Sequence, residues 1–374
     1  MFPEIDSNNY VEVEKEDYSS IEDIQNPFDP KKIKFTTKPL TLDLLIKRLK
    51  ANPPAINLHP EFQRKEVWDL TKQSRLIESL LLRFPLPAFY FDGSNEDYWE
   101  VIDGLQRLST IRDFVIYKSF TLQNLEYLTQ FNGNKFDDLP GTFQRRIEEA
   151  QITAFIIEEG TPEDVKFNIF KRINTWGEPL KPQEIRHALN QGEPSKLVEE
   201  MANMEEFKEA TGNINPKRMG DRDFVTRFIS FYLVTYRNYM PDLDTFLNKG
   251  MAEISKLNET EKTRLKNDFK AAMITAHNIF GEYAFRKLNE GEGRKSRINK
   301  SLFDTWSVAL SKLSSNERNK LEQNEEKVKK ALIDLIKNDQ DFTEAISVGT
   351  GDKRKVETRF SKIEELVKNL VEND

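Results

Sequence analysis

Apolar positions follow two different patterns along the chain, which divide it into a mixed front part and a helical rear part. Between residues 27 and 192, apolar residues at helical spacing alternate with short apolar runs that are typical of buried strands. Beyond this point only helical spacing continues. The pattern predicts an α+β domain over residues 27–192, followed by an all-helical domain over residues 193–374.

Individual elements of both parts can be placed from the same pattern. In the front part, helices are predicted at 42–49, 70–84, 105–115, 162–173 and 182–191, and strands at 88–91, 98–102 and 152–157. Thr41 is available as an N-cap for the first helix, and Gly192 as a C-cap for the last. In the rear part, helices are expected around 224–232, 269–285, 302–313 and 328–336.

Composition excludes several classes of site. The chain of 374 residues has no cysteine, so disulfides, thiolate metal sites and cysteine nucleophiles are excluded. His59, His187 and His277 are far apart in the sequence, which argues against a histidine-rich zinc site or an HNH-type nuclease centre. The polar start does not resemble a signal peptide, and no apolar run approaches the ~20 residues of a membrane span. A soluble, cytoplasmic protein is expected.

Charge is distributed unevenly along the chain. Residues 1–26 contain eight acidic residues and one lysine, which predicts a flexible acidic arm. Such an arm either stays solvated or docks on a basic partner, and the sequence leaves both open. The net charge of −7 gives no overall attraction to nucleic acid, so DNA binding would need a local basic patch.

Polar residues lie where a predicted strand turns directly into a helix. The strand ends in Asp103-Gly104, and helical spacing begins at once. Glycine permits close approach of a ligand to the backbone, and the first turn of a helix presents N–H groups that bind anions. Arg107 could grip phosphate oxygens, Asp103 could hold Mg²⁺ or orient a water, and Gln106 could contact either a phosphate or that water. The alternative is an ordinary turn, with Asp103 capping the helix and Arg107 solvated. The chain contains no P-loop motif.

Two further stretches place charged residues beside Gly, Pro or Trp. They span residues 57–68 and 170–187. The polar residues of interest are Gln63 and Arg64 in the first stretch, and Arg172, Asn174, Glu184 and Arg186 in the second. Taken singly, each of these charges is also typical of a solvated or paired surface residue.

Together, the three stretches resemble the signature of the N-terminal domain of GmrSD-type restriction endonucleases. The matching patterns are Phe-Gln-Arg…Val-Trp at 62–68, Asp-Gly-x-Gln-Arg-Leu-x-Thr at 103–110 and Phe-x-Arg-Ile-Asn…Glu-Ile-Arg at 170–186. The resemblance covers residues 27–192 strongly and the helical part more weakly. It implies a ParB/sulfiredoxin-like core in which the strand–Gly–helix–Arg element contacts nucleotide phosphates. It also implies a role in bacterial defence against foreign DNA.

The resemblance further implies roles for individual residues. Characterised relatives hydrolyse nucleoside triphosphates and control a nuclease domain on the same or a partner chain. By position, the catalytic residues would be Asp103 and Gln106, with Mg²⁺ at Asp103, and the nucleotide-binding residues Gln63, Arg64, Gly104, Arg107, Ser109, Arg172, Asn174, Glu184 and Arg186. The chain departs from the family at Leu105, where Gln is frequent, and at Trp176, where Gly is usual. The first change removes a polar contact, and the second adds a ring that could narrow the pocket or stack on a base.

Three functions stay open on the sequence alone. The first is a nucleotide-binding regulatory protein of a defence system, with or without NTP hydrolysis, that serves a separate nuclease or other defence protein. The second is a non-enzymatic ParB-like DNA-binding module, for which Lys31, Lys32, Lys34 and Lys38 would supply the basic face. The third is a Mg²⁺-dependent ParB-like nuclease, which needs a second carboxylate beside Asp103, from Glu61, Glu66 or Glu184. The nucleotide and the oligomeric state also stay open.

Overall fold

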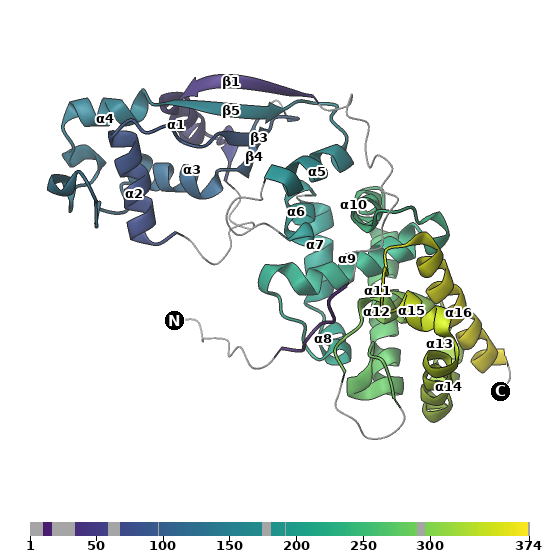
Figure 1. Ribbon diagram of the computed structural model, residues 1–374. Helices are drawn as coiled ribbons and strands as arrows, with labels where there is room; N and C mark the ends of the chain where they lie inside the picture. Colours follow the sequence, from purple (N-terminus) through teal and green to yellow (C-terminus); the bar gives the residue numbers. More distant parts are fainter. Residues whose placement is uncertain are drawn as a thin grey trace. The chain divides into compact units, whose positions relative to one another are not determined.

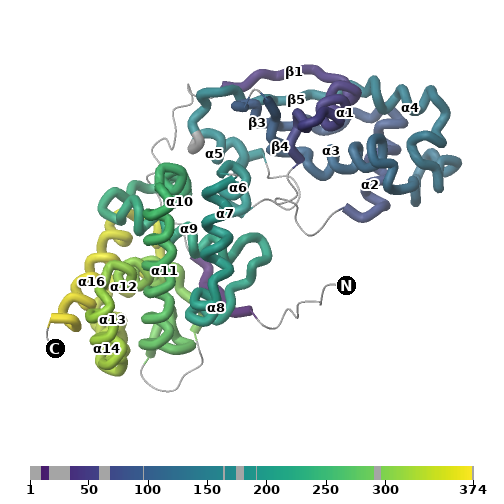
Figure 2. The backbone as a smooth tube through the Cα atoms, turned by 180° about the vertical axis from the view of Figure 1, so that it is seen from behind, coloured from purple at the N-terminus to yellow at the C-terminus, as the bar shows by residue number. Residues whose placement is uncertain are grey.

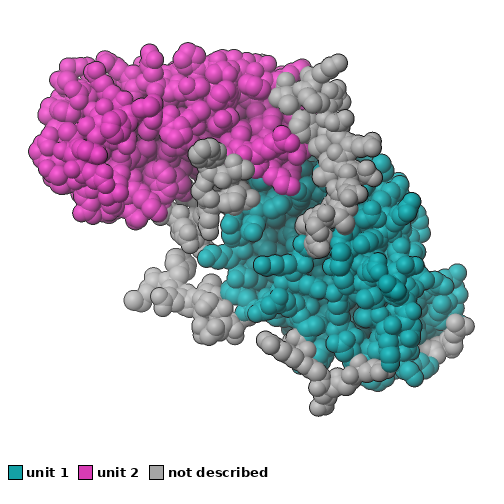
Figure 3. Space-filling model, viewed as in Figure 1, with its two compact units in different colours: residues 1–27, 181–374 teal, residues 28–180 magenta. Residues whose placement is uncertain are grey.

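The chain forms two compact units (Figure 3). Each unit has its own hydrophobic core. The computed structural model describes residues 10–16, 34–58, 68–95, 97–173, 181–190, 192–289 and 296–372. The mixed unit comprises residues 28–180, and the helical unit comprises residues 1–27 together with 181–374. The chain therefore leaves the helical unit once, builds the mixed unit, and returns.

The mixed unit is built on a five-stranded sheet with strand order β1-β5-β3-β4-β2 (Figure 1). The strands are β1 (Phe35–Thr41), β2 (Ile56–Asn57), β3 (Phe89–Asp92), β4 (Trp99–Asp103) and β5 (Gln151–Ile157). β5 is antiparallel to β1 and parallel to β3, whereas β4 is antiparallel to β3 and parallel to β2. The sheet is thus mixed, which confirms the α+β prediction for this part of the chain.

One face of this sheet carries the core of the mixed unit. Phe89 and Phe91 of β3 and Ala154 of β5 are fully buried there. Apolar side chains from four helices complete this core: α1 (Leu42–Lys50), α2 (Leu70–Leu81), α3 (Leu105–Ile111) and α4 (Gly141–Glu148). α3 continues directly into a π-helical turn, Arg112–Ile116, so the helix predicted over 105–115 is present with a widened last part. The unit ends with α5 (Glu163–Ile173).

The sequence located the three inner strands and missed the two edge strands. β1 has the sequence FTTKPLT and is mostly exposed, so it shows no apolar alternation, and β2 has only two residues. The predicted helix at 42–49 is confirmed, but Thr41 makes no side-chain cap. At α2 the cap is Asp69, whose carboxylate accepts a hydrogen bond from the Lys72 N–H at 2.8 Å.

The helical unit confirms the all-helical prediction for the rear part (Figure 2). Its α-helices are α6 (Pro182–Leu189), α7 (Glu193–Ala202), α8 (Glu205–Thr211), α9 (Gly220–Leu233), α10 (Leu243–Ile254), α11 (Glu259–Phe280), α12 (Lys300–Ser311), α13 (Ser315–Gln323), α14 (Glu325–Asn338), α15 (Gln340–Ala345) and α16 (Lys353–Glu372). No strand longer than an isolated bridge occurs in its described residues.

The boundary between the units lies earlier than the sequence indicated. We expected it after residue 192, whereas the units divide between Leu180 and Lys181. α6 belongs to the helical unit because it packs against α9 and α10. Gly192 is not the C-cap of α6, which ends at Leu189 with Asn190 as its C-cap; Gly192 is instead the N-cap of α7, with φ of 85°.

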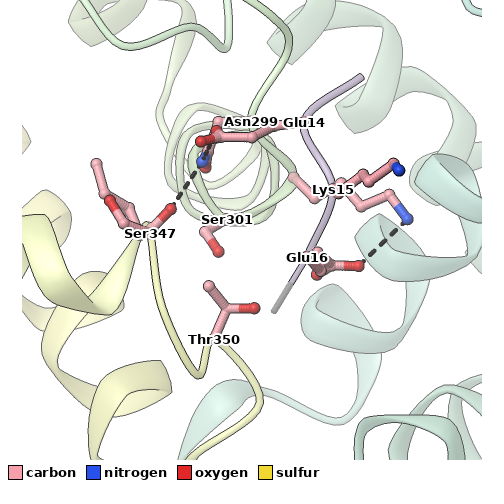
Figure 4. A pocket seen from close by; sticks show the side chains of 9 residues that line it. Glu14, Lys15, Glu16, Asn299, Ser301, Ser347 and Thr350 are labelled. Atoms are coloured by element: carbon pink, nitrogen blue, oxygen red, sulfur yellow. Dashed lines mark hydrogen bonds and ion pairs between the residues drawn. The ribbon is translucent and has the colours of Figure 1, made fainter. Parts of the chain in front are cut away.

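The segment 10–16 is part of the helical unit, which corrects the expectation of a flexible arm over this stretch. Val11 forms a parallel β-bridge with Ile214, and Val13 forms one with Ile298. The alternating glutamates form ion pairs: Glu12 with Arg297, Glu14 with Lys287, and Glu16 with Arg227 and Lys300. Figure 4 shows Glu14 beside Asn299, whose amide donates to it at 2.6 Å. The glutamates of this segment thus pair with basic residues of the same chain. The rest of the predicted arm, residues 1–9 and 17–26, lies outside the described residues.

Candidate functional site

A β-bulge in β4 places the Asp103 side chain on the face of the sheet opposite the core. Phe91 lies opposite Val101, and Tyr90 lies opposite Asp103, so Ile102 is the extra residue on β4. Directly opposed residues share a face of a sheet, and Phe91 belongs to the core. Asp103 and Tyr90 therefore lie together on the outer face. Bulges commonly re-aim a side chain in this way beside functional sites.

Gly104 connects this strand to α3 in a conformation that other residues avoid. Its φ is 99°, in the left-handed region, and it is the N-cap of α3. A β-carbon there would lie 2.4 Å from Cδ1 of the buried Phe89 ring. The glycine is therefore required by the fold itself, whether or not a ligand approaches.

Arg107 is buried and fixed by several partners, which neither sequence interpretation anticipated. Its guanidinium donates to the Pro87 carbonyl, to the Ala88 carbonyl at 3.0 Å and to Asp103 Oδ2 at 2.7 Å. It also lies over the Phe89 ring, 4.4 Å from the centroid. Burial lowers the pKa of Arg107, partly offset by Asp103, yet an arginine stays charged at neutral pH. Arg107 thus joins the start of β3 to the strand–helix turn.

The N-terminus of α3 has no side-chain cap. The Asp103 carboxylate points to Arg107 and not to the helix, which overturns the alternative that Asp103 caps it. The first N–H groups of a helix have no partner within it, and uncapped helix N-termini of this kind are places where anions bind in proteins. Gln106 lies in this first turn, and its Oε1 accepts a weak hydrogen bond from the Trp68 N–H at 3.4 Å. A turn with uncapped N–H groups and a fixed positive charge behind it can bind phosphate.

The other residues carried over from the family are placed unevenly. Ser109 is buried on α3, and its hydroxyl has no hydrogen-bond partner among the described residues. Arg172 is exposed near the end of α5. Gln63, Arg64 and Asn174 lie outside the described residues, as do Trp176, Glu61, Glu66, Lys31 and Lys32.

Glu184 and Arg186 lie on α6 in the helical unit, where both have polar partners. Glu184 accepts from Arg218 Nη2 at 2.7 Å. Arg186, 1% exposed, pairs with Asp244 and lies 3.6 Å from Asp223. These contacts hold α6 to α9 and α10. They account for both side chains without a ligand, so a nucleotide contact for either stays a prediction.

The outer face of the sheet also carries polar residues that the sequence did not single out. Asp92, at the end of β3, forms an ion pair with Lys166 of α5 at 2.9 Å, and both side chains are buried. Glu100 lies opposite Asp92 in the sheet. The bulge at Ile102 brings these residues to the same face as Asp103. Nothing in the sequence marks a bulge. The sequence feature that points to this polar face is the density of acidic residues between 92 and 103.

The described residues offer little of what a metal site, a ligand cavity or a membrane span requires. The described ranges contain no group of three His, Cys, Asp or Glu side chains arranged to hold a metal ion. The cavity in Figure 4, lined by Glu14 and Ser301 among others, measures about 10 Å³, room for at most one water molecule. Within the described ranges, every helix is too short or too polar to cross a lipid bilayer.

Comparison with known families supplies the decisive observation. Residues 43–190 match the family described as the GmrSD restriction endonuclease, N-terminal domain. Over these residues the chain is similar to the GmrSD N-terminal domain family. The match confirms the resemblance and links the chain to DNA restriction. It includes α6, so the GmrSD domain continues past the boundary of the mixed unit. No curated protein and no solved structure matches the chain, and the ParB-like topology therefore stays a prediction.

Proposed function

We propose that this GmrSD-domain protein binds a nucleoside triphosphate at the Asp103–Arg107 turn and regulates a restriction system directed against foreign DNA. The observation that carries the proposal is the uncapped N-terminus of α3, with the charge of Arg107 held directly behind it. The Asp103 carboxylate directly precedes the N-cap residue Gly104 and is the nearest candidate in the sequence to cap the N–H groups of α3. That carboxylate is instead held by Arg107.

Different groups of the turn would make different contacts with the nucleotide. The N–H groups of the first turn would contact phosphate oxygens, supported by the helix dipole and by the Arg107 charge. Three of the five N–H groups of Arg107 are already donated to Pro87, Ala88 and Asp103, so Arg107 would position the turn more than grip the ligand. Ser109 has a buried hydroxyl without a partner and is a further candidate donor.

Hydrolysis would require Asp103 and Gln106 in addition. The Asp103 side chain is 34% exposed, and only its Oδ2 is held by Arg107. Mg²⁺ bound mainly through nucleotide phosphates and waters needs only one or two protein carboxylates, so Asp103 fits as a ligand although the described residues offer no complete cage. Gln106 would orient the attacking water. The bound nucleotide would then control a separate nuclease or another protein of the defence system.

Nucleotide binding and phosphate release test this function directly. ATP, GTP, CTP and UTP are each titrated into the purified full chain by calorimetry, and released phosphate is measured with and without Mg²⁺ and DNA. The proposal predicts saturable binding of at least one nucleotide. Absence of binding by all four, with and without Mg²⁺ and DNA, would contradict it.

A further inference from the structure

An aromatic row follows the outer face of the sheet up to the phosphate turn. Tyr90 of β3 stacks on Phe155 of β5, with ring centroids 4.9 Å apart and an interplanar angle of 17°. Phe155 in turn meets Phe35 of β1 edge to face at 6.1 Å. None of these rings belongs to the hydrophobic core of the mixed unit, which lies on the other face.

Tyr90 is the member of this row next to the phosphate turn. It lies directly opposite Asp103 in the sheet, because of the bulge at Ile102. Burial lowers the pKa of Arg107, Asp103 offsets part of this effect, and Tyr90 makes a smaller contribution in the same direction as Asp103. The Tyr90 side chain is only partly buried. One ring face stacks on Phe155 of β5, and β4 with Asp103 lies on the other side of β3.

The geometry points to Tyr90 as the residue that stacks on the base of the bound nucleotide. The inference rests on the proposed function, since the phosphates at the turn bring the base to this face. A partly exposed π-ring next to a phosphate site fits a flat nucleobase, and stacking tolerates any of the four bases. Phe155 would fix the orientation of Tyr90 and would not touch the base.

Comparing ATP with tripolyphosphate separates base recognition from phosphate recognition. Both ligands are titrated into the full chain and into Tyr90→Ala, with folding confirmed by circular dichroism. Loss of one base stack should weaken ATP binding by about fivefold to a hundredfold and leave tripolyphosphate binding unchanged. Tyr90→Phe keeps the ring and should bind ATP like the unmodified protein. Phe35→Ala removes an exposed ring of the same row, farther from the turn, and should also change nothing. Tyr90→Leu, which keeps apolar bulk without a π-ring, should behave like Tyr90→Ala and replaces it if that variant does not fold.

Each result supports or overturns one statement. Unchanged ATP affinity in folded Tyr90→Ala or Tyr90→Leu overturns the stacking assignment and leaves the phosphate site intact. Equal affinity of the unmodified protein for ATP and tripolyphosphate also overturns the stacking assignment and leaves the phosphate site intact. If the unmodified protein binds neither ligand, the proposed function fails, and the stacking assignment fails with it.

Discussion

A β-carbon on Gly104 would lie 2.4 Å from Cδ1 of Phe89, a ring that is fully buried. Gly104→Ala should therefore destabilise the protein twice over, through the left-handed backbone and through the clash, by roughly 2–4 kcal/mol in total. Gly133→Ala is the matched control, because Gly133 also has a positive φ, 87°, but nothing within 4 Å of the added carbon. Chemical denaturation of both variants checks the prediction. Equal losses of stability would show that the Phe89 contact is unimportant.

Asp103→Asn should separate binding from turnover. The substitution keeps the shape of the side chain and removes a negative charge next to the bound phosphates. Nucleotide affinity without metal should stay the same or increase, whereas any Mg²⁺-dependent phosphate release should be lost. Asp113→Asn is the control, since Asp113 pairs with Arg112 at 2.8 Å on the same helical run, away from the turn. Turnover that persists in Asp103→Asn would remove Asp103 from the catalytic residues.

The chain alone is expected not to linearise plasmid DNA in the presence of Mg²⁺. Its three histidines are far apart in the sequence, and the described residues hold no three-ligand metal group. A histidine-based nuclease centre that activates water is therefore not expected. Agarose gels with supercoiled plasmid test this. Strong cleavage that disappears in Asp103→Ala would favour the ParB-like nuclease instead.

Low pH should weaken the helical unit through Asp223. Burial alone would raise the pKa of this carboxyl, but Lys300, Arg227 and Arg186 outweigh burial and lower the pKa from 3.8 to about 2. A carboxyl with a depressed pKa stabilises the folded state above its unfolded pKa and loses this contribution as pH falls. Between pH 4 and pH 2, the unmodified protein should lose about 2 kcal/mol more stability than Asp223→Asn. Parallel stability curves for the two proteins over this range would contradict the assignment.

The sequence was informative where local pattern decides structure. The inner strands, most helices and the strand–Gly–helix turn all follow from apolar spacing and from Gly104. The edge strand β1 could not be predicted in the same way, because its mostly exposed side chains show no apolar alternation. It is a strand because its backbone pairs with β5.

The candidate site was predicted less completely, because its geometry depends on distant residues. Arg107 finds its acceptors at Pro87 and Ala88, which directly precede β3, so its burial could not be read from the helix that carries it. The bulge at Ile102, which aligns Asp103 with Tyr90, has no sequence signature. Glu184 and Arg186 appeared to belong to the same site, but their partners lie in the helical unit.

Calorimetric titration of nucleotide into Arg107→Ala and Arg107→Lys tests the central claim most directly. Both variants are first shown to be folded by circular dichroism and thermal denaturation, because Arg107 also holds the Ala88 carbonyl. If its charge and position support a phosphate site, Arg107→Ala should weaken nucleotide binding by roughly tenfold to a hundredfold, or about 1.5–3 kcal/mol. Arg107→Lys should recover only part of this loss, since an ammonium cannot reproduce the guanidinium contacts. Unchanged nucleotide affinity in folded Arg107→Ala would contradict the phosphate site at this turn.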